Sequence, residues 1–187
     1  MSLGDIQPKV IGVNQGSAMQ LIEQKILQVA VGPAVTFSNI PQNFSHLHLK
    51  LVARCADAST QTNLSLRLNG DGGSNYSDQL FITSNTSISA AHDSAATYAY
   101  LGYITANSAT ANYAGFMIVD FPNYTNTTFY KSFTSYAGGM PNSGANSTQR
   151  CGGGSWANQA AINSINIYDP NGSGFMIGSG FWLYGIV

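Results

Sequence analysis

Alternation of apolar and polar residues is the most regular pattern along this chain. Between residues 46 and 55, leucines and an alanine alternate with histidine, lysine and arginine, so an extended strand here has one apolar and one polar side. Residues 63–69 repeat the pattern with Leu64, Leu66 and Leu68. Both segments predict β-strands with one face in a protein core.

The remaining apolar runs extend this prediction over most of the chain. Residues 17–31 fit helical spacing only in part, and their valine-rich end favours a strand. Segments rich in Gly, Asn, Ser and Pro separate the runs and are typical of turns. The uneven spacing and the lack of an internal repeat argue against a propeller or a β-helix. Further strands are predicted at 74–84, 97–104, 113–121, 127–138, 162–169 and 180–187.

This pattern predicts an all-β fold, an antiparallel β-sandwich that resembles a jelly roll. A length of 187 residues suits one domain. Residues 1–20 have only isolated apolar side chains among Gly, Gln and Ser, and we expect them to form an N-terminal arm. Such an arm would be held by the domain, by another copy or by a different protein. The sandwich domain is expected over residues 21–187.

The closing segment, "GSGFWLYGIV", is apolar on both faces of a strand. A strand that is apolar on both sides is covered on both sides, by the core on one and by a neighbour or a loop on the other. We therefore expect this strand to lie centrally in a sheet, with Leu183 or Trp182 in the core.

Charge excludes several classes of partner. Charged residues make up 8% of the chain, the formal net charge is -1, and the seven Lys and Arg residues are scattered singly. No basic patch for nucleic acid is present. No run reaches the roughly 20 apolar residues that span a bilayer, and the N-terminus lacks the basic head and apolar run of a secretory signal. We expect neither nucleic acid nor a membrane as a partner.

The acid-bearing glycine run at residues 69–73, Asn-Gly-Asp-Gly-Gly, raises the question of a phosphate or calcium site. A phosphate loop needs a helix after it, whereas the following residues favour a strand. The neighbouring oxygen ligands lack the spacing and the closing Glu of an EF-hand. We expect a turn that returns Leu68 and Tyr76 to the core.

No catalytic or metal site emerges from the sequence. His46 and His48 lie two apart on a predicted strand, so they share a face, but no third ligand accompanies them and we expect solvent-facing or interface residues. No G-x-S-x-G motif is present, and the run "CGGGSW" at 151–156 indicates glycine-rich flexibility beside a strand. The carboxylates fall mostly in predicted loops. We expect no enzyme, no cofactor and no metal.

Three segments carry a resemblance to a known group of proteins. They are "FSNIPQNFSHLHLKLVAR" (37–54), "LSLRLNGDGGSNYS" (64–77) and "GSGFWLYGI" (178–186), and together they resemble tailed-bacteriophage virion proteins. In that group the segments occur in the same order, and the match runs from about residue 21 to the end. The resemblance implies a jelly-roll-like sandwich in a minor structural, tail or fibre, or head-decoration protein. It leaves the position in the particle open.

Two functions follow from this resemblance. The first is a non-enzymatic structural component of the virion, assembled in the host bacterial cytoplasm, that binds other virion proteins and itself. A surface with few charged residues and many Tyr and Gly residues has apolar patches that a monomer rarely exposes, so we expect a homo-oligomer. The symmetry common in virions favours a homotrimer. The alternative is a receptor module for a host-surface glycan, because Tyr and Trp offer flat faces to sugars. Candidate interface or glycan contacts are Tyr98, Tyr100, Tyr124, Tyr136 and Trp156.

The two cysteines, Cys55 and Cys151, lie at the ends of predicted strands. A protein made in the bacterial cytosol is expected to keep buried thiols reduced. A disulfide would need Cα atoms within about 7 Å, so the pairing of these cysteines stays open at this point.

Overall fold

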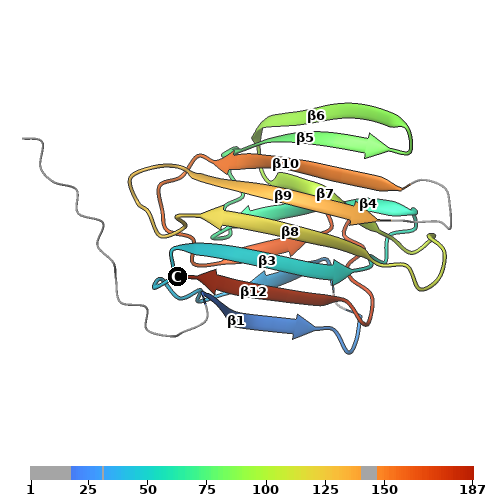
Figure 1. The fold of residues 1–187 in the computed structure, drawn as a ribbon, viewed down its shortest axis with the longest axis horizontal. Helices are drawn as coiled ribbons and strands as arrows, with labels where there is room; N and C mark the ends of the chain where they lie inside the picture. Colours follow the sequence, from blue (N-terminus) through green and yellow to red (C-terminus); the bar gives the residue numbers. More distant parts are fainter. Residues whose placement is uncertain (1–17, 31, 140–146) are drawn as a thin grey trace, which may run out of the picture.

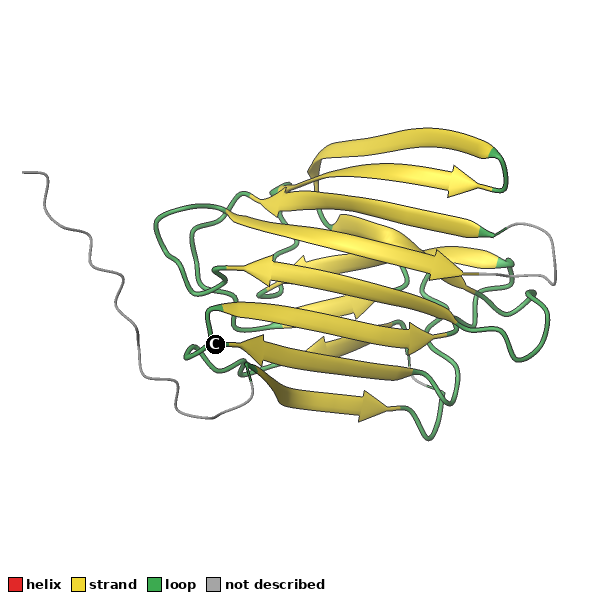
Figure 2. Ribbon diagram, in the orientation of Figure 1, coloured by secondary structure: helices red, strands yellow, loops and turns green. Residues whose placement is uncertain are grey.

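The computed structural model describes residues 18–30, 32–139 and 147–187. These residues form twelve strands and no helix. The strands make two antiparallel sheets that pack on each other (Figures 1 and 2). The predicted all-β antiparallel sandwich is confirmed.

The large sheet contains eight strands and the small sheet four. The strands of the large sheet are β1 (Met19–Ile26), β3 (His46–Ala53), β5 (Tyr76–Ser84), β6 (Ser87–Ala96), β8 (Gly115–Pro122), β9 (Lys131–Gly139), β10 (Thr148–Trp156) and β12 (Gly180–Ile186). Those of the small sheet are β2 (Ala34–Phe37), β4 (Gln61–Leu68), β7 (Ala99–Thr105) and β11 (Ile165–Tyr168). The order is β1-β12-β3-β8-β9-β10-β5-β6 in the large sheet and β2-β11-β4-β7 in the small one.

Strands from the two ends of the chain pair in a nested manner. β1 pairs with β12 and β3 with β8 in the large sheet, while β2 pairs with β11 and β4 with β7 in the small sheet. The hairpin β5–β6 and the pair β9–β10 extend the large sheet beyond β8. The large sheet therefore projects past the small one at this side (Figure 1).

The core fills the space between the sheets with the apolar faces of the alternating strands. Leu64, Leu66 and Leu68 of β4 are fully buried, and so are the three leucines of β3. Because every second residue of these strands points inward, the alternation in the sequence fixes which face is buried.

The closing strand β12 lies between β1 and β3, one strand in from the edge of the large sheet. Phe181 and Leu183 point into the core, and Trp182 and Tyr184 lie half-buried on the outer face. Leu183 thus occupies the predicted core position, and the strand has a hydrogen-bonded neighbour on each side.

The expected arm lies mostly outside the described residues, which begin at residue 18. Met19 and Gln20 already belong to β1, opposite Ile186 and Gly185 of β12. The sheet therefore begins before the predicted boundary at residue 21, because backbone pairing with β12 holds this segment.

The glycine run after β4 forms a tight turn, as predicted. Asn69 and Gly70 have positive φ angles of 53° and 69°, and the N–H of Asp71 donates to the carbonyl of Leu68 at 2.9 Å. Leu68 and Tyr76 are both fully buried. The turn leads from β4 in the small sheet to β5 in the large one, so it joins the two layers.

The glycine run of "CGGGSW" has a different role from the one expected. Gly152, Gly153 and Gly154 lie inside β10 and pair with β5 on one side and β9 on the other, so the expectation of flexibility beside a strand is wrong. A Cβ added at Gly154 would lie 2.4 Å from the carbonyl oxygen of Ser77 and 2.5 Å from the ring of Phe133. Glycine is needed here because neighbouring strands approach too closely for a side chain.

Candidate functional site

The aromatic residues expected to form one contact surface are divided between the core and the two outer faces. Trp156 and Tyr124 are 1% and 0% exposed, so the prediction that they are contact residues is wrong. The ring of Trp156 stacks against Tyr76 with centroids 6.5 Å apart, and the hydroxyl of Tyr124 donates to the carbonyl of Pro41. Both side chains are buried because their polar tips find partners within the protein.

Tyr98 and Tyr100 do come together, on the outer face of the small sheet. Their rings meet edge to face at 5.1 Å, and Tyr98 also meets Tyr168 of β11 edge to face at 5.9 Å. The guanidinium of Arg67 in β4 lies 5.2 Å over the ring of Tyr168. We call these four residues, contributed by three separate segments, the tyrosine cluster.

A hollow of about 300 Å³ lies beside the tyrosine cluster, lined by Arg67, Asn166 and Tyr168 among others. The Nε of Arg67 donates to the carbonyl of Thr97 at 3.0 Å, which fixes the position of the guanidinium. Burial raises the pKa of Tyr168 to about 12, so this hydroxyl is protonated at neutral pH. The hollow thus combines an aromatic ring with cationic and amide donors.

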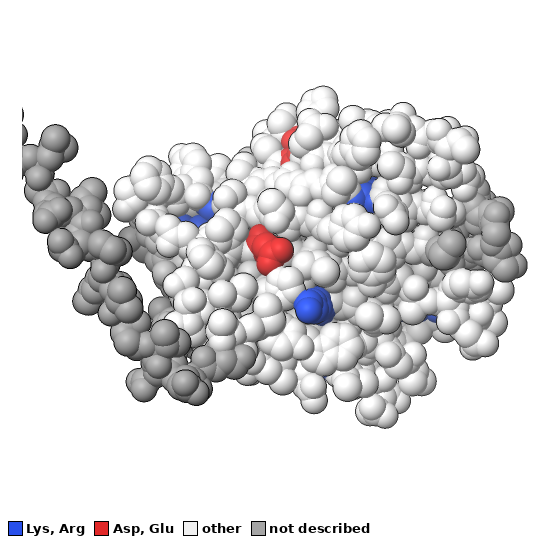
Figure 3. Space-filling view, in the orientation of Figure 1, with Lys and Arg blue, Asp and Glu red and all other residues white. Residues whose placement is uncertain are grey.

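Tyr136 lies apart from this cluster, on the outer face of the large sheet. It is exposed and packs against Phe116 with ring centroids 5.6 Å apart. Val52 and Phe81 are exposed on the same face, so apolar side chains cross several strands. Figure 3 shows this face, on which few charged residues are visible.

The two histidines of β3 are also on the outer face of the large sheet. Nδ1 of His48 lies 2.5 Å from Oδ1 of Asp120, and Nδ1 of His46 accepts the N–H of Asn123 at 2.9 Å. In the described ranges no group of three or more His, Cys, Asp or Glu side chains is placed to hold a metal ion. Each histidine instead fixes a neighbouring strand or turn.

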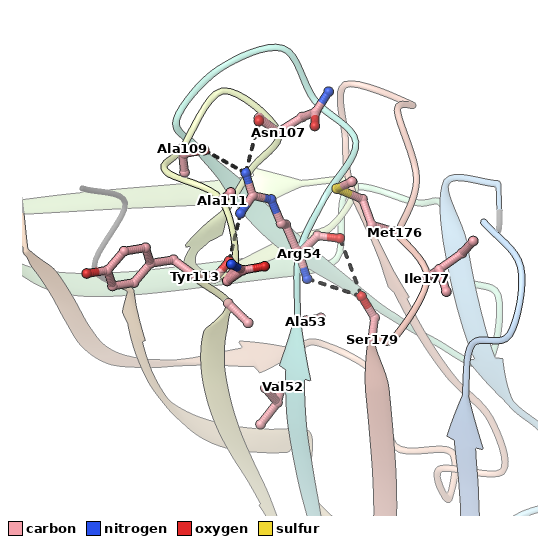
Figure 4. A pocket seen from close by; sticks show the side chains of 13 residues that line it. Val52, Ala53, Arg54, Asn107, Ala109, Ala111, Tyr113, Met176, Ile177 and Ser179 are labelled. Atoms are coloured by element: carbon pink, nitrogen blue, oxygen red, sulfur yellow. Dashed lines mark hydrogen bonds between the residues drawn. The ribbon is translucent and has the colours of Figure 1, made fainter. Parts of the chain in front are cut away.

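A hollow surrounds Arg54, directly after β3 (Figure 4). It has a volume of about 520 Å³, and we call it the Arg54 cleft. Its apolar lining includes Val52, Met176 and Ile177, and Asn107 and Tyr113 come from the loop between β7 and β8. None of the described lining residues carries a carboxylate, an imidazole or a thiol, and the hydroxyl groups among them are those of Tyr113 and Ser179.

Arg54 holds the loop that forms one wall of the cleft. One terminal nitrogen donates to the carbonyls of Thr110 and Tyr113 at 2.9 and 3.0 Å. The other donates to those of Asn107 and Ala109 at 3.0 and 2.7 Å. The Nε is buried and has no hydrogen-bond partner among the described residues. The donor edge of the guanidinium is therefore occupied by backbone carbonyls.

A pair of aromatic residues projects from the opposite end of the sandwich. Phe129 and Tyr130 are 70% and 64% exposed in the loop between β8 and β9. We call this pair the aromatic tip. The sequence pattern does not select Phe129, and the only signal is two adjacent aromatic residues after the polar run "NYTNTT".

Lys131 fixes the loop that carries the aromatic tip. Its side chain is almost fully buried, and Nζ donates to the carbonyls of Asn126, Phe129 and Gln159. Burial lowers the pKa of this ammonium, and the three carbonyls replace part of the water that it loses. Oδ1 of Asn126 accepts the N–H groups of Thr128 and Phe129, both at 2.8 Å. The tip is thus held by a rigid backbone.

Both cysteines are free thiols in the structure. Cys55 is buried, whereas Cys151 is exposed on the outer face of the large sheet, opposite Tyr136 and Phe81. The question that the sequence leaves open is thereby answered, because the two residues do not form a disulfide.

Comparisons of the chain with protein-family models, with curated proteins and with solved structures found no match. The part of the chain that the structure describes contains no helix of the length and apolar character that crossing a membrane requires.

Proposed function

We propose that the chain is a non-enzymatic structural component of a tailed-phage virion. It acts by protein–protein binding, as a capsid decoration or cement protein or as a tail- or fibre-associated protein. Its partners are other copies of itself, in a homotrimer, and other virion proteins. The observation that carries this proposal is an outer sheet face with little charge and several exposed apolar side chains.

The positions of the three segments that resemble tailed-phage virion proteins support this proposal. The first segment contains β3 and the last contains β12, and these two strands pair directly over their length. The second segment contains the end of β4 and the turn that leads to β5. The resemblance therefore covers residues that meet in space.

The nested strand pairing supports the jelly-roll part of the proposal. Pairing of early strands with late ones in two facing sheets is the arrangement expected when a long antiparallel hairpin is rolled into two Greek keys. The β5–β6 and β9–β10 strands would then be additions to the large sheet.

Particles of the phage that encodes the chain test this function. Mass spectrometry of purified particles should detect the protein in a fixed ratio to the major capsid or tail protein. Electron microscopy with a gold-labelled antibody fragment should place it at repeated positions on the particle. Detection only in the lysate, with no label on intact particles, would refute the virion role.

A glycan-binding module of a phage tail or fibre is a second candidate, favoured by the hollow beside the tyrosine cluster. There an aromatic ring lies beside Arg67 and Asn166, the combination that binds a sugar ring by stacking and hydrogen bonds. A glycan array should show binding that is lost in Arg67→Ala and kept in Lys50→Ala, an exposed cation on the other sheet. Equal binding by both variants would exclude this site.

A further inference from the structure

We propose that the Arg54 cleft receives the aromatic tip, Phe129 and Tyr130, of a second copy of the chain. The resulting contact is head to tail, because one end of one copy meets the opposite end of the next. It does not depend on a role in a virion.

The chemistry of the Arg54 cleft selects an uncharged aromatic ligand. Both terminal nitrogens of Arg54 already donate to loop carbonyls, and its Nε is buried, so an anion finds no free donor on this side chain among the described residues. The planar face of a guanidinium stacks well on an aromatic ring. Around it, Val52 and Ile177 are 47% and 67% exposed, and Met176 adds a sulfur that favours aromatic contacts.

The aromatic tip has the matching properties. It presents two adjacent rings without a charge, and most of the surface of both side chains is exposed. Lys131 and Asn126 fix the backbone on either side of the rings. A rigid loop loses little conformational freedom on binding, so its burial in a partner costs less than that of a mobile loop.

The two features are at opposite ends of one pair of strands. Arg54 follows the end of β3, and the loop with the aromatic tip follows the end of β8. Because β3 and β8 are antiparallel neighbours, their following segments lie at opposite ends of the sheet (Figure 1). A copy therefore cannot fill its own cleft, and each copy can make both contacts at once.

The size of the cleft also fits. A volume of about 520 Å³ is within the range of roughly 300–1,000 Å³ typical of pockets that enclose a ligand. Two aromatic side chains bury about 150–250 Å² each, so a single contact lies at the small end of interfaces and is weak. Repetition around a closed ring, as in a homotrimer, or along an open chain would add to its strength.

Sedimentation velocity over a series from micromolar to millimolar protein tests the contact. The wild-type chain should associate further as its concentration rises. The tip variant Phe129→Ser/Tyr130→Ser and the cleft variant Val52→Lys/Ile177→Lys should each stay monomeric. An equimolar mixture should form a dimer and nothing larger, because only one intact cleft and one intact tip remain. The control Ile88→Ser, an exposed side chain of β6 at the far edge of the large sheet, should associate like the wild type.

The contact is overturned if the wild type stays monomeric throughout, if either variant still associates, or if the mixture gives no dimer. A monomer whose cleft binds a glycan or an unrelated peptide would also overturn the assignment to a second copy. Cysteine cross-linking provides a second readout that is independent of association strength. In a Cys151→Ser background, a Tyr130→Cys chain should form a disulfide with an Ile177→Cys chain and not with a Val187→Cys chain. Equal cross-linking to both positions counts against the geometry.

Discussion

The indole Nε1 of Trp156 donates a hydrogen bond to Oδ2 of Asp71 at 2.7 Å, joining the end of β10 to the turn between the two sheets. The same carboxylate accepts the side-chain amide of Asn75 at 2.8 Å and the N–H of Gly73 at 2.7 Å. With three donors on its two oxygens, Asp71 links the turn to the end of β10.

Asp71→Asn should make the free energy of unfolding less sensitive to pH in the acid range. The pKa of Asp71 is lowered by hydrogen bonds from Trp156, Asn75 and Gly73. A carboxyl with a lowered pKa stabilises the folded state above its ordinary value of 3.8 and loses that contribution as pH falls through its folded value. Urea unfolding at a series of pH values should show the wild type more stable at pH 7 and the difference shrinking in acid. A difference that does not change with pH would contradict this account.

Asp78→Asn should stabilise the protein at neutral pH. Burial raises the pKa of Asp78, which is on the inner face of β5 and accepts the N–H of Tyr100 at 3.0 Å. A carboxyl with a raised pKa costs stability once the pH rises above its ordinary value, because the buried site disfavours the charged form. Asparagine keeps the acceptor without the charge. We expect a gain of about 1 kcal/mol, or roughly 2–4 °C in melting temperature. A lower melting temperature would show that the charge itself is needed.

Gly154→Ala should destabilise the large sheet. The added methyl group would meet the carbonyl oxygen of Ser77 and the ring of Phe133. Overpacking of this kind costs about 1–3 kcal/mol. Gly72→Ala is the matched control, because nothing lies within 4 Å of its added Cβ. Denaturant unfolding that gives equal stabilities for the two variants would rule out the close approach of β10 to its neighbours.

Truncation after Ile177 should abolish folding. It removes Phe181 and Leu183, which each contribute about 1.5–3 kcal/mol when buried, and it leaves β1 without its hydrogen-bonded neighbour. That loss approaches a total stability of about 5–15 kcal/mol. Circular dichroism should show no cooperative melt, whereas removal of the exposed Val187 alone should leave the melt unchanged. Cooperative melting of the longer truncation near the full-length temperature would disprove the claim.

The sequence predicts most of the strands because most of them have one buried face. Every strand predicted from an apolar run is present, whereas β2, β6 and β10 are missed. β2 has only four residues, nine of the ten residues of β6 are exposed on both faces, and glycines interrupt the pattern of β10. Period-two alternation reports a difference between two faces, so a strand without that difference leaves no such signal.

The candidate sites are less predictable because they depend on distant segments. The i, i+2 spacing of Tyr98 and Tyr100 places them on one face, but Arg67 and Tyr168 join them only through the pairing of β4, β7 and β11. The polar, glycine-rich residues around Trp156 in the sequence suggest a surface position. Its side chain is buried instead, and its hydrogen-bond partner is 85 residues away. Burial of an aromatic side chain in a turn-rich segment is set by such long-range partners.

Strand β6 is exposed on both faces, so it can open while the rest of the sandwich stays folded. Among the described strands, β6 pairs with β5 alone, and none of its side chains is fully buried. Its amides should therefore exchange with deuterated solvent by local fraying, well before the core strands open. An edge that opens without unfolding the core can also change in length and sequence at little cost to stability, so insertions and substitutions in this chain should be tolerated best at β6.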